Sequence, residues 1–277
     1  MENGAGRKTG YISLPIAALA AVTVALGAAA VSASRPALII QKSITANDRD
    51  WRAQDDFRYD ERVIRSNVDS EGHAKVQGSK TFAVLMIEGS PYRRLMALNN
   101  EPLKGAQETA EQGKLARETA RRRNESAAER KKRIAKYQEQ REEEHLLMQQ
   151  MATAFEFRLL GEDEIAGVPC YRMAATPRAD YVPPVEKARV LKGMRGTMWI
   201  DKAQFHWVKV QAEVIQPVTF GFFIAKVNPG TRFELEQAPV GLYWLPKHFV
   251  QTVNASVFGL YGYRTRDESF YSAYKRE

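Results

Sequence analysis

Apolar and polar residues alternate with a period of two along most of the chain, which is typical of half-buried antiparallel strands. The clearest run is 206–215. One side of this strand is apolar and consists of Val208, Val210, Ala212 and Val214, and the other side is mainly polar and consists of Trp207, Lys209, Gln211 and Glu213. Similar runs occupy 56–98 and most of the chain after residue 154, with turn sequences such as Asn228-Pro229-Gly230 between them. We therefore expect about eleven strands joined mainly by short turns.

One block, 103–152, does not alternate. It consists largely of Lys, Arg, Glu, Gln and Ala and contains no proline after Pro102, so we expect it to be helical. From Glu101 to Met151 it carries twelve Lys and Arg against ten Glu, which favours a solvated helix over a nucleic-acid arm. An apolar stripe near its end predicts packing on a sheet. We expect a bend at Gly113 or near Asn124.

These patterns predict an α+β fold that is mostly β. A long antiparallel meander either closes into a barrel or stays open with one face covered, and the helical block is the evident cover. We expect one domain, 34–277: a large curved antiparallel sheet, an open half-barrel, covered by helices, with the charged helical insertion 103–152. The proline-rich loop 176–192, centred on Tyr181, Pro183 and Pro184, is predicted to be a surface flap that gates a binding site.

The N-terminus has the pattern of an export signal. Arg7 and Lys8 precede an uncharged apolar run from Thr9 to Ser34, and Val31-Ser32-Ala33 has small residues where signal peptidase needs them. We expect residues 1–33 to be a signal peptide, cleaved after Ala33, and the protein to be periplasmic. The alternative is an uncleaved inner-membrane anchor, 11–33, with the domain facing the periplasm, since the run reaches the roughly 20 residues that span a bilayer.

Charge and cysteine content limit the kinds of molecule that the protein is expected to bind. The net charge of +8 favours transient contact with an anionic membrane surface, while the absence of a nucleic-acid motif, together with export, argues against nucleic acid as a partner. The single cysteine, Cys170, excludes an internal disulfide and is expected to be a small buried strand residue. It also stands too far from the apolar run to be a lipidated N-terminus.

No motif for catalysis stands in the sequence. The four histidines, His73, His145, His206 and His248, lack zinc-site spacing, and no nucleophile elbow, P-loop or dinucleotide fingerprint is present. We therefore expect no catalytic residues, no metal site, no cofactor and no enzymatic activity. A hydrolase acting on envelope polymers stays open as a third class, because catalytic groups can be distant in sequence.

Short motifs carry a resemblance to a known superfamily. The run Gly196 to Asp201 (GTMWID) and the following Trp207 to Val210 (WVKV) resemble a strand pair of the outer-membrane lipoprotein carrier and receptor superfamily (LolA/LolB/RseB-like). Trp244-Leu245-Pro246 is similar to its Trp-x-Pro strand, and Ile165 to Tyr171 to its Gly-x-Pro-x-Tyr hairpin. The resemblance covers most of 56–263. The charged insertion and the proline-rich loop are not part of the plan of the well-studied carrier. It implies a lipoprotein-sorting type of protein, with a half-barrel around an apolar cavity in the periplasm.

The leading hypothesis is a non-catalytic periplasmic carrier that binds a lipid or the acyl chains of a lipoprotein. Burying each methylene would contribute about 0.8 kcal/mol. The larger apolar strand and helix residues predicted to line the acyl cavity are Met148, Met151, Met198, Ile200, Phe220, Phe222, Phe233, Leu235, Phe249 and Val253. The alternative is a structural or regulatory envelope protein that docks a protein partner, and the long charged helix favours it. An apolar cavity would support the carrier, and a filled core the docking protein.

Overall fold

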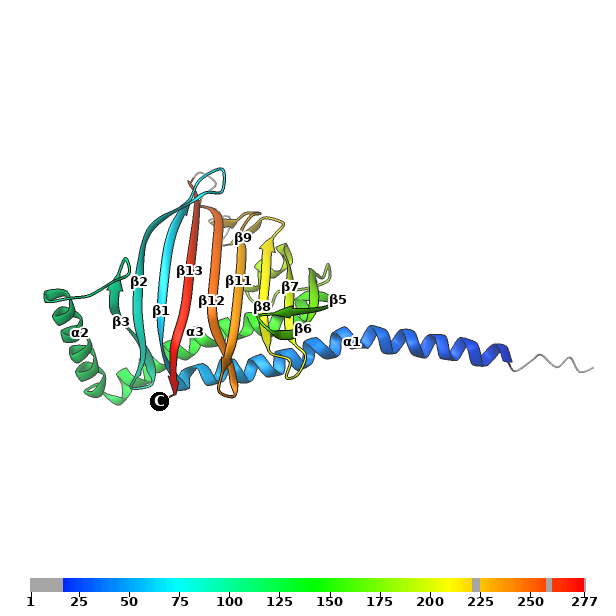
Figure 1. Cartoon of the computed structure of the whole chain (residues 1–277), viewed down its shortest axis with the longest axis horizontal. Coiled ribbons are helices and arrows are strands. Elements are labelled where there is room, and N and C mark those ends of the chain that lie inside the picture. Colours follow the sequence, from blue (N-terminus) through cyan, green and yellow to red (C-terminus); the bar gives the residue numbers. More distant parts are fainter. Residues whose placement is uncertain (1–16, 221–224, 258–260, 277) are drawn as a thin grey trace, which may run out of the picture.

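The computed structural model describes the backbone of residues 17–220, 225–257 and 261–276 (Figure 1), and side chains from Arg35 onwards except 221–225 and 258–261. Residues 1–16 of the predicted leader, and Phe222 of the predicted cavity, lie outside these ranges. The described strands are β1 (Phe57–Val68), β2 (Ala74–Ile87), β3 (Ser90–Leu98), β4 (Glu101–Pro102), β5 (Phe155–Ile165), β6 (Val168–Pro177), β7 (Met194–Asp201), β8 (Trp207–Val214), β9 (Val218–Phe220), β10 (Ala225–Val227), β11 (Arg232–Val240), β12 (Tyr243–Val257) and β13 (Tyr261–Arg276).

The strands form one large antiparallel sheet that does not close into a barrel, and the predicted α+β, mostly β fold is confirmed, with 51% of the chain in strands. In the described residues the sheet order is β4-β3-β2-β1-β13-β12-β11-β8-β7-β6-β5, and the short β9 and β10 pair beside it. Most neighbours are consecutive hairpins, as expected of a meander. Two pairs in this order are not consecutive: β11 pairs with β8, and β13 returns to pair with β1, which places the last strand in the middle of the sheet.

The charged insertion is helical, as predicted, but it is two helices. Helix α2 (Ala106–Arg123) ends at Asn124, whose amide donates to the Ala120 carbonyl, and α3 (Ala127–Ala154) begins after Ser126. Ser126 and Glu129 satisfy each other's backbone amides in a capping box, which fixes the start of α3. The bend therefore falls near Asn124, and Gly113 lies inside α2.

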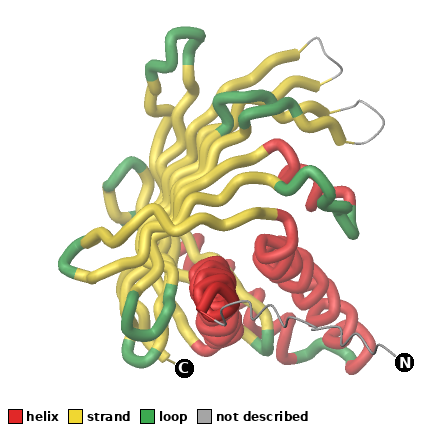
Figure 2. The backbone as a smooth tube through the Cα atoms, turned by 90° about the vertical axis from the view of Figure 1, so that its right-hand side faces the viewer, coloured by secondary structure: helices red, strands yellow, loops and turns green. Residues whose placement is uncertain are grey.

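The helices gather on one side of the sheet (Figure 2). Helix α1 (Ala17–Ala53) runs along the sheet beside α3, and its first half extends beyond the β5 edge (Figure 1). A short 3-10 helix, η2 (Glu186–Gly193), connects the loop after β6 to β7, and another, η1 (Gln54–Asp56), joins α1 to β1. Among the side chains that the structure describes, no helix combines the length and the apolar character needed to cross a membrane.

The second half of α1 is packed tightly against the sheet. Ile39 and Ile40 lie in a core cluster with strand residues, and Trp207 donates its indole N–H to Ser43 Oγ over 3.3 Å. Asp50 is 2% exposed and accepts from Nδ1 of the fully buried His206 over 2.5 Å. These contacts make the 39–53 part of α1 an integral element of the fold.

Candidate functional site

The helix side of the sheet collects most of the predicted cavity residues. Met198 stands opposite Val210, Val210 opposite Leu235, and Leu235 opposite Phe249, so this row shares one face. Ile200, Phe233 and Val253 have the same parity on their strands as members of that row. Phe220 lies apart, on the short β9.

This face is packed, at least around Met198. Met198 is 2% exposed and Ile200 is fully buried, in one cluster with Met173 and Trp207. Met148 and Met151 of α3 pack against the same cluster. Side chains from α1 and α3 thus occupy the space in which an acyl chain was expected, and close-packed interiors leave few voids larger than a water molecule.

The proline-rich loop lies on the surface, but Tyr181 at its centre is buried. Val182 is 82% exposed, but Tyr181 is 5% exposed and donates to Oε1 of Gln150 on α3 over 3.1 Å. Tyr181 also belongs to a core cluster with Leu191 of η2. The loop therefore presents Pro184 and Val182 to solvent while Tyr181 anchors it in the core, because its ring finds apolar neighbours and its hydroxyl a partner.

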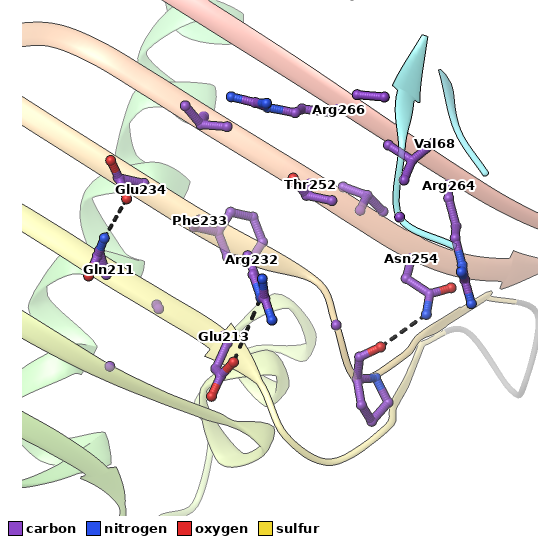
Figure 3. Close-up of a pocket in the computed structure, with 18 of the residues that line it drawn as sticks. Val68, Gln211, Glu213, Arg232, Phe233, Glu234, Thr252, Asn254, Arg264 and Arg266 are labelled. Carbon is purple, nitrogen blue, oxygen red and sulfur yellow. Dashed lines mark hydrogen bonds and ion pairs between the residues drawn. The ribbon is translucent and has the colours of Figure 1, made fainter. Parts of the chain in front are cut away.

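The opposite face of the sheet holds an open cleft of about 830 Å³. Its floor consists of the polar positions of β7, β8, β11, β12 and β13, and the tip of the β1–β2 hairpin borders one end through Val68, Gly72 and Ala74. Figure 3 shows these side chains standing on the strands, with the ribbon of α3 behind the sheet. Phe233 and Val253 also border the cleft.

Ion pairs organise one side of the cleft floor. Arg195 contacts Glu213 at 2.5 Å, and Arg232 lies 3.8 Å from the same carboxylate. Glu234 accepts from Gln211 over 2.5 Å (Figure 3). Burial raises the pKa of Glu234, but hydrogen bonds from Gln211 and Lys209 more than offset it and hold that pKa below its usual value.

The other side of the floor is richer in cations. Arg264 donates to the backbone carbonyls of Asp69 and Ser70 over 3.3 and 3.1 Å and pairs with no carboxylate among the described residues. Arg266 lies 3.1 Å from Glu268, and Asn254 donates to the Pro229 carbonyl over 3.0 Å. Arginine and amide groups side by side on an open floor are suited to hydrogen bonding with carboxylates and peptide groups.

One group in the cleft has the side chains of a metal site. The ligand atoms of Glu234, Glu236 and His248 lie within 4.8 Å of one another. However, the ammonium of Lys209 lies 3.0 Å from both carboxylates, and His248 Nε2 lies 2.8 Å from Glu268. The place that a divalent cation would take between the two glutamates is thus held by a lysine.

The buried His206–Asp50 pair resembles two members of a catalytic triad, but its surroundings differ. The Nε2 atom of His206, which would activate a nucleophile, lies 3.2 Å from Arg49 Nη2 and from Gln204 Oε1. Among the described residues no hydroxyl or thiol hydrogen-bonds to this ring. Cys170 is fully buried in β6, where burial raises the pKa of its thiol to about 11.

The polar residues that line the cleft alternate with the apolar residues along the same strands. The polar members of the alternating strands, among them Gln211 and Glu213, share one side of their strand. The register places them beside Arg195 and Arg232 of neighbouring strands, so they form a continuous polar floor. Only the pairing of strands distant in sequence reveals this convergence.

No protein-family model matches the sequence, and no curated protein is similar to it at a meaningful level. Among solved structures, it is similar to a putative outer membrane lipoprotein-sorting protein domain from Vibrio parahaemolyticus, with 11% identity over 86% of this chain and 93% of that chain and a TM-score of 0.34. A DUF1329 family protein from Desulfovibrio piger has 11% identity, coverage of 87% and 92%, and a TM-score of 0.31. A LolA superfamily protein from Nitrosomonas europaea has 11% identity, coverage of 87% and 93%, and a TM-score of 0.29.

The Vibrio structure is named for lipoprotein sorting and the Nitrosomonas structure for the LolA superfamily, which are the names that the sequence motifs led us to expect. At such identities and TM-scores, the ligand and the partner have to be inferred from the side chains of this chain.

Proposed function

We propose that this chain is a non-catalytic binding protein of the bacterial envelope that docks an extended segment of a partner protein in the arginine-lined cleft. The supporting observation is the contrast between the two faces of the sheet. The helix side is packed around Met198 and Ile200, whereas the opposite side offers about 830 Å³ of open, mixed polar and apolar lining. Open hydrogen-bonding groups on a rigid sheet suit a peptide better than an acyl chain.

The periplasm is the proposed location, on the basis of the basic and apolar N-terminal pattern. The alternative, an inner-membrane anchor at 11–33, places the same domain in the same compartment. Both forms fit a docking role.

Site-specific crosslinking in the bacterial envelope tests this proposal. The full-length chain, carrying a photo-crosslinking amino acid in place of Thr252 on the cleft floor, should capture one defined protein. Arg232→Glu should abolish this adduct, because Arg232 has a 72% exposed side chain in the cleft and, among the described residues, contacts a single carboxylate. Lys132→Glu on the exposed side of α3 makes the same charge change away from the cleft and should leave the adduct intact. Equal adducts from all three proteins would refute docking in the cleft.

A carrier of lipid or lipoprotein acyl chains is the second candidate. The methionines at the contact between α3 and the sheet, Met148, Met151 and Met198, favour it, because flexible thioether side chains can repack around a guest. Native mass spectrometry of the full-length chain before and after organic extraction decides the point. A released phospholipid or acylated peptide would establish the carrier, and Tyr181→Ala should then change its uptake if the loop gates the site. An unchanged mass and no uptake of a fluorescent fatty acid would exclude it.

A further inference from the structure

Helix α1 joins the folded domain to an apolar segment of the chain. The sequence carries no charge from Thr9 to Ser34, and the first charged residue after that run is Arg35. The backbone of α1 continues as one helix from Ala17 to Ala53 and leaves the domain past the β5 edge (Figure 1). Whatever accommodates the apolar run must therefore lie close to this end of the domain.

The surface beside this exit is cationic and aromatic. Arg35 lies over the ring of Tyr171 at 5.8 Å, and Lys42 lies over Phe205 at 4.8 Å. Lys202, from the turn between β7 and β8, lies 5.6 Å from the same Tyr171 ring. The exit surface, as we call it, thus combines cations from α1 and from a turn that is distant in sequence.

The exit surface carries three cations beside one carboxylate. Among the described residues, neither Arg35 nor Lys42 forms an ion pair, whereas Lys202 contacts Glu162 at 2.6 Å. Lys202, and Arg35 from farther away, lower the pKa of Glu162. Leu38, on the same outward side of α1 between the two cations, is 52% exposed. Free basic groups beside an exposed leucine and amphipathic rings are the composition found at membrane interfaces.

We propose that the exit surface is a contact site for a lipid bilayer with anionic headgroups. Seven residues separate Arg35 from Lys42, which corresponds to about 10 Å along a helix. This rise is enough to span the headgroup layer of one leaflet, which is about 5–8 Å thick, since a bilayer measures about 40–45 Å with its headgroups and about 30 Å across its core. In the uncleaved form of the chain, with the apolar run in that core, Arg35, Leu38 and Lys42 cross the headgroup layer, and the turn at Lys202 rests on it.

This contact is independent of the docking role. The cleft opens on the face of the sheet away from the helices, and its lining contains no residue of α1. A domain held at the bilayer by the exit surface therefore keeps the cleft free for a partner.

The experiment uses the full-length chain in liposomes of phosphatidylcholine alone or with one quarter phosphatidylglycerol. An environment-sensitive thiol dye is attached at Ala203→Cys, an exposed site in the turn next to Lys202. Ala203 is distant from the apolar run in sequence, so the dye reports the surface and not the inserted helix. Cys170 is fully buried and escapes labelling, which the unsubstituted chain checks. A second reporter, Val76→Cys, is 62% exposed on the β1–β2 hairpin at the far end of the sheet.

We expect brominated lipids to quench the dye at residue 203 in the anionic liposomes and to spare the dye at residue 76. Arg35→Glu with Lys42→Glu should lower the quenching at residue 203 in the anionic liposomes at least tenfold, since each cation near an anionic surface contributes about fivefold to binding. Lys131→Glu with Lys132→Glu, on the exposed side of α3, makes the same change in net charge and should have no effect. Quenching at residue 203 that ignores lipid charge, or an equal loss from both double variants, would overturn the proposal.

Discussion

At the scale of single residues, the buried pair of His206 and Asp50 fastens α1 to the sheet. His206 is fully buried and stacks on Trp244, with ring centroids 5.6 Å apart. Asp50 Oδ2 accepts from the imidazole, while Asp50 Oδ1 is buried without a hydrogen-bond partner. Removing one member of such a pair leaves the other polar group desolvated and unpaired. The resulting loss of folding free energy is larger than the net stabilisation that the intact pair provides.

Asp50→Ala is therefore expected to lower the free energy of unfolding by about 3–5 kcal/mol, as measured by urea denaturation. Asp48→Ala is the matched control two residues away. Asp48 pairs with Arg52 and His145, but its side chain is 28% exposed, so the loss should be about 1 kcal/mol. Adding His206→Ala to Asp50→Ala should cost far less than His206→Ala alone. Additive losses would show that the two side chains do not act as a pair.

Trp207 shows why side-chain faces cannot be read from alternation alone. Strict alternation placed it with Lys209, Gln211 and Glu213 on the polar side. In the structure the register slips, so that Trp199 pairs with Lys209 but Ile200 pairs with Trp207. This irregularity turns Trp207 to the helix side, where it is 6% exposed and reaches Ser43. A one-residue bulge reverses every face beyond it, and no local sequence pattern announces it here.

At the scale of elements, the α2–α3 hairpin is attached to the turn between β2 and β3 by two arginines, Arg122 of α2 and Arg133 of α3. Arg133 donates to the Glu88 carbonyl over 3.0 Å and to Ser90 Oγ over 2.6 Å. Arg122 is 6% exposed and donates to the carbonyls of Ile87 and Ser90 over 2.9 and 2.7 Å and to that of Pro91 over 3.2 Å. Its Nε donates to Glu118 over 2.6 Å within α2. The neighbouring Arg123 has a 70% exposed side chain. Arg123 lies 3.8 Å from Glu88 of the same turn, an exposed contact that should hold α2 far less firmly than the buried hydrogen bonds of Arg122.

Arg122→Met should release α2 without unfolding the sheet. The substitution keeps length and helix propensity but removes the donors that bind the turn, so amide hydrogen exchange in 106–123 should accelerate by at least tenfold. Exchange in β12 and β13 should not change. Arg123→Met is the control and should leave exchange in α2 as it is. If the two variants behave alike, the attachment is not due to Arg122.

Element types could be predicted from sequence because they depend on local periodicity. The strands from 154 onward and the helical insertion followed from periods of two and 3.6. The break near Asn124 was one of two expected positions, and Gly113 was the other. The packing of the proline-rich loop could not be predicted, because Tyr181 is buried through Gln150, 31 residues away. The polar cleft could not be predicted either, because it depends on contacts between residues distant in sequence. It brings Arg264 to the carbonyls of Asp69 and Ser70, nearly 200 residues away.

At the scale of the whole molecule, the sheet is completed where the last strand returns to the first. β13 pairs with β1 from Phe57 opposite Arg276 to Asn67 opposite Thr265. Three tyrosines fill this seam on the helix side: the ring centroid of Tyr59 lies 6.0 Å from that of Tyr271 and 5.3 Å from that of Tyr274. Burial, followed by the nearby Glu61 carboxylate, raises the pKa of Tyr59 to about 12, and burial also raises the pKa values of Tyr271 and Tyr274.

These raised pKa values predict an alkaline limit to stability. A phenol whose folded pKa exceeds the unfolded value of about 10 contributes stability that is complete below pH 10 and is lost as pH rises through the folded pKa. Tyr59 alone should account for about 2–3 kcal/mol lost between pH 10 and 12, since one pKa unit corresponds to about 1.4 kcal/mol. Urea denaturation at pH 9, 10 and 11 measures this slope. Tyr59→Phe should make it shallower by up to about 1.4 kcal/mol per pH unit, because the phenylalanine cannot ionise in either state. Tyr263→Phe, at a 48% exposed position, should keep the slope of the unsubstituted protein. If Tyr59→Phe also keeps it, the seam tyrosines do not limit stability, and alkaline unfolding starts elsewhere in the molecule.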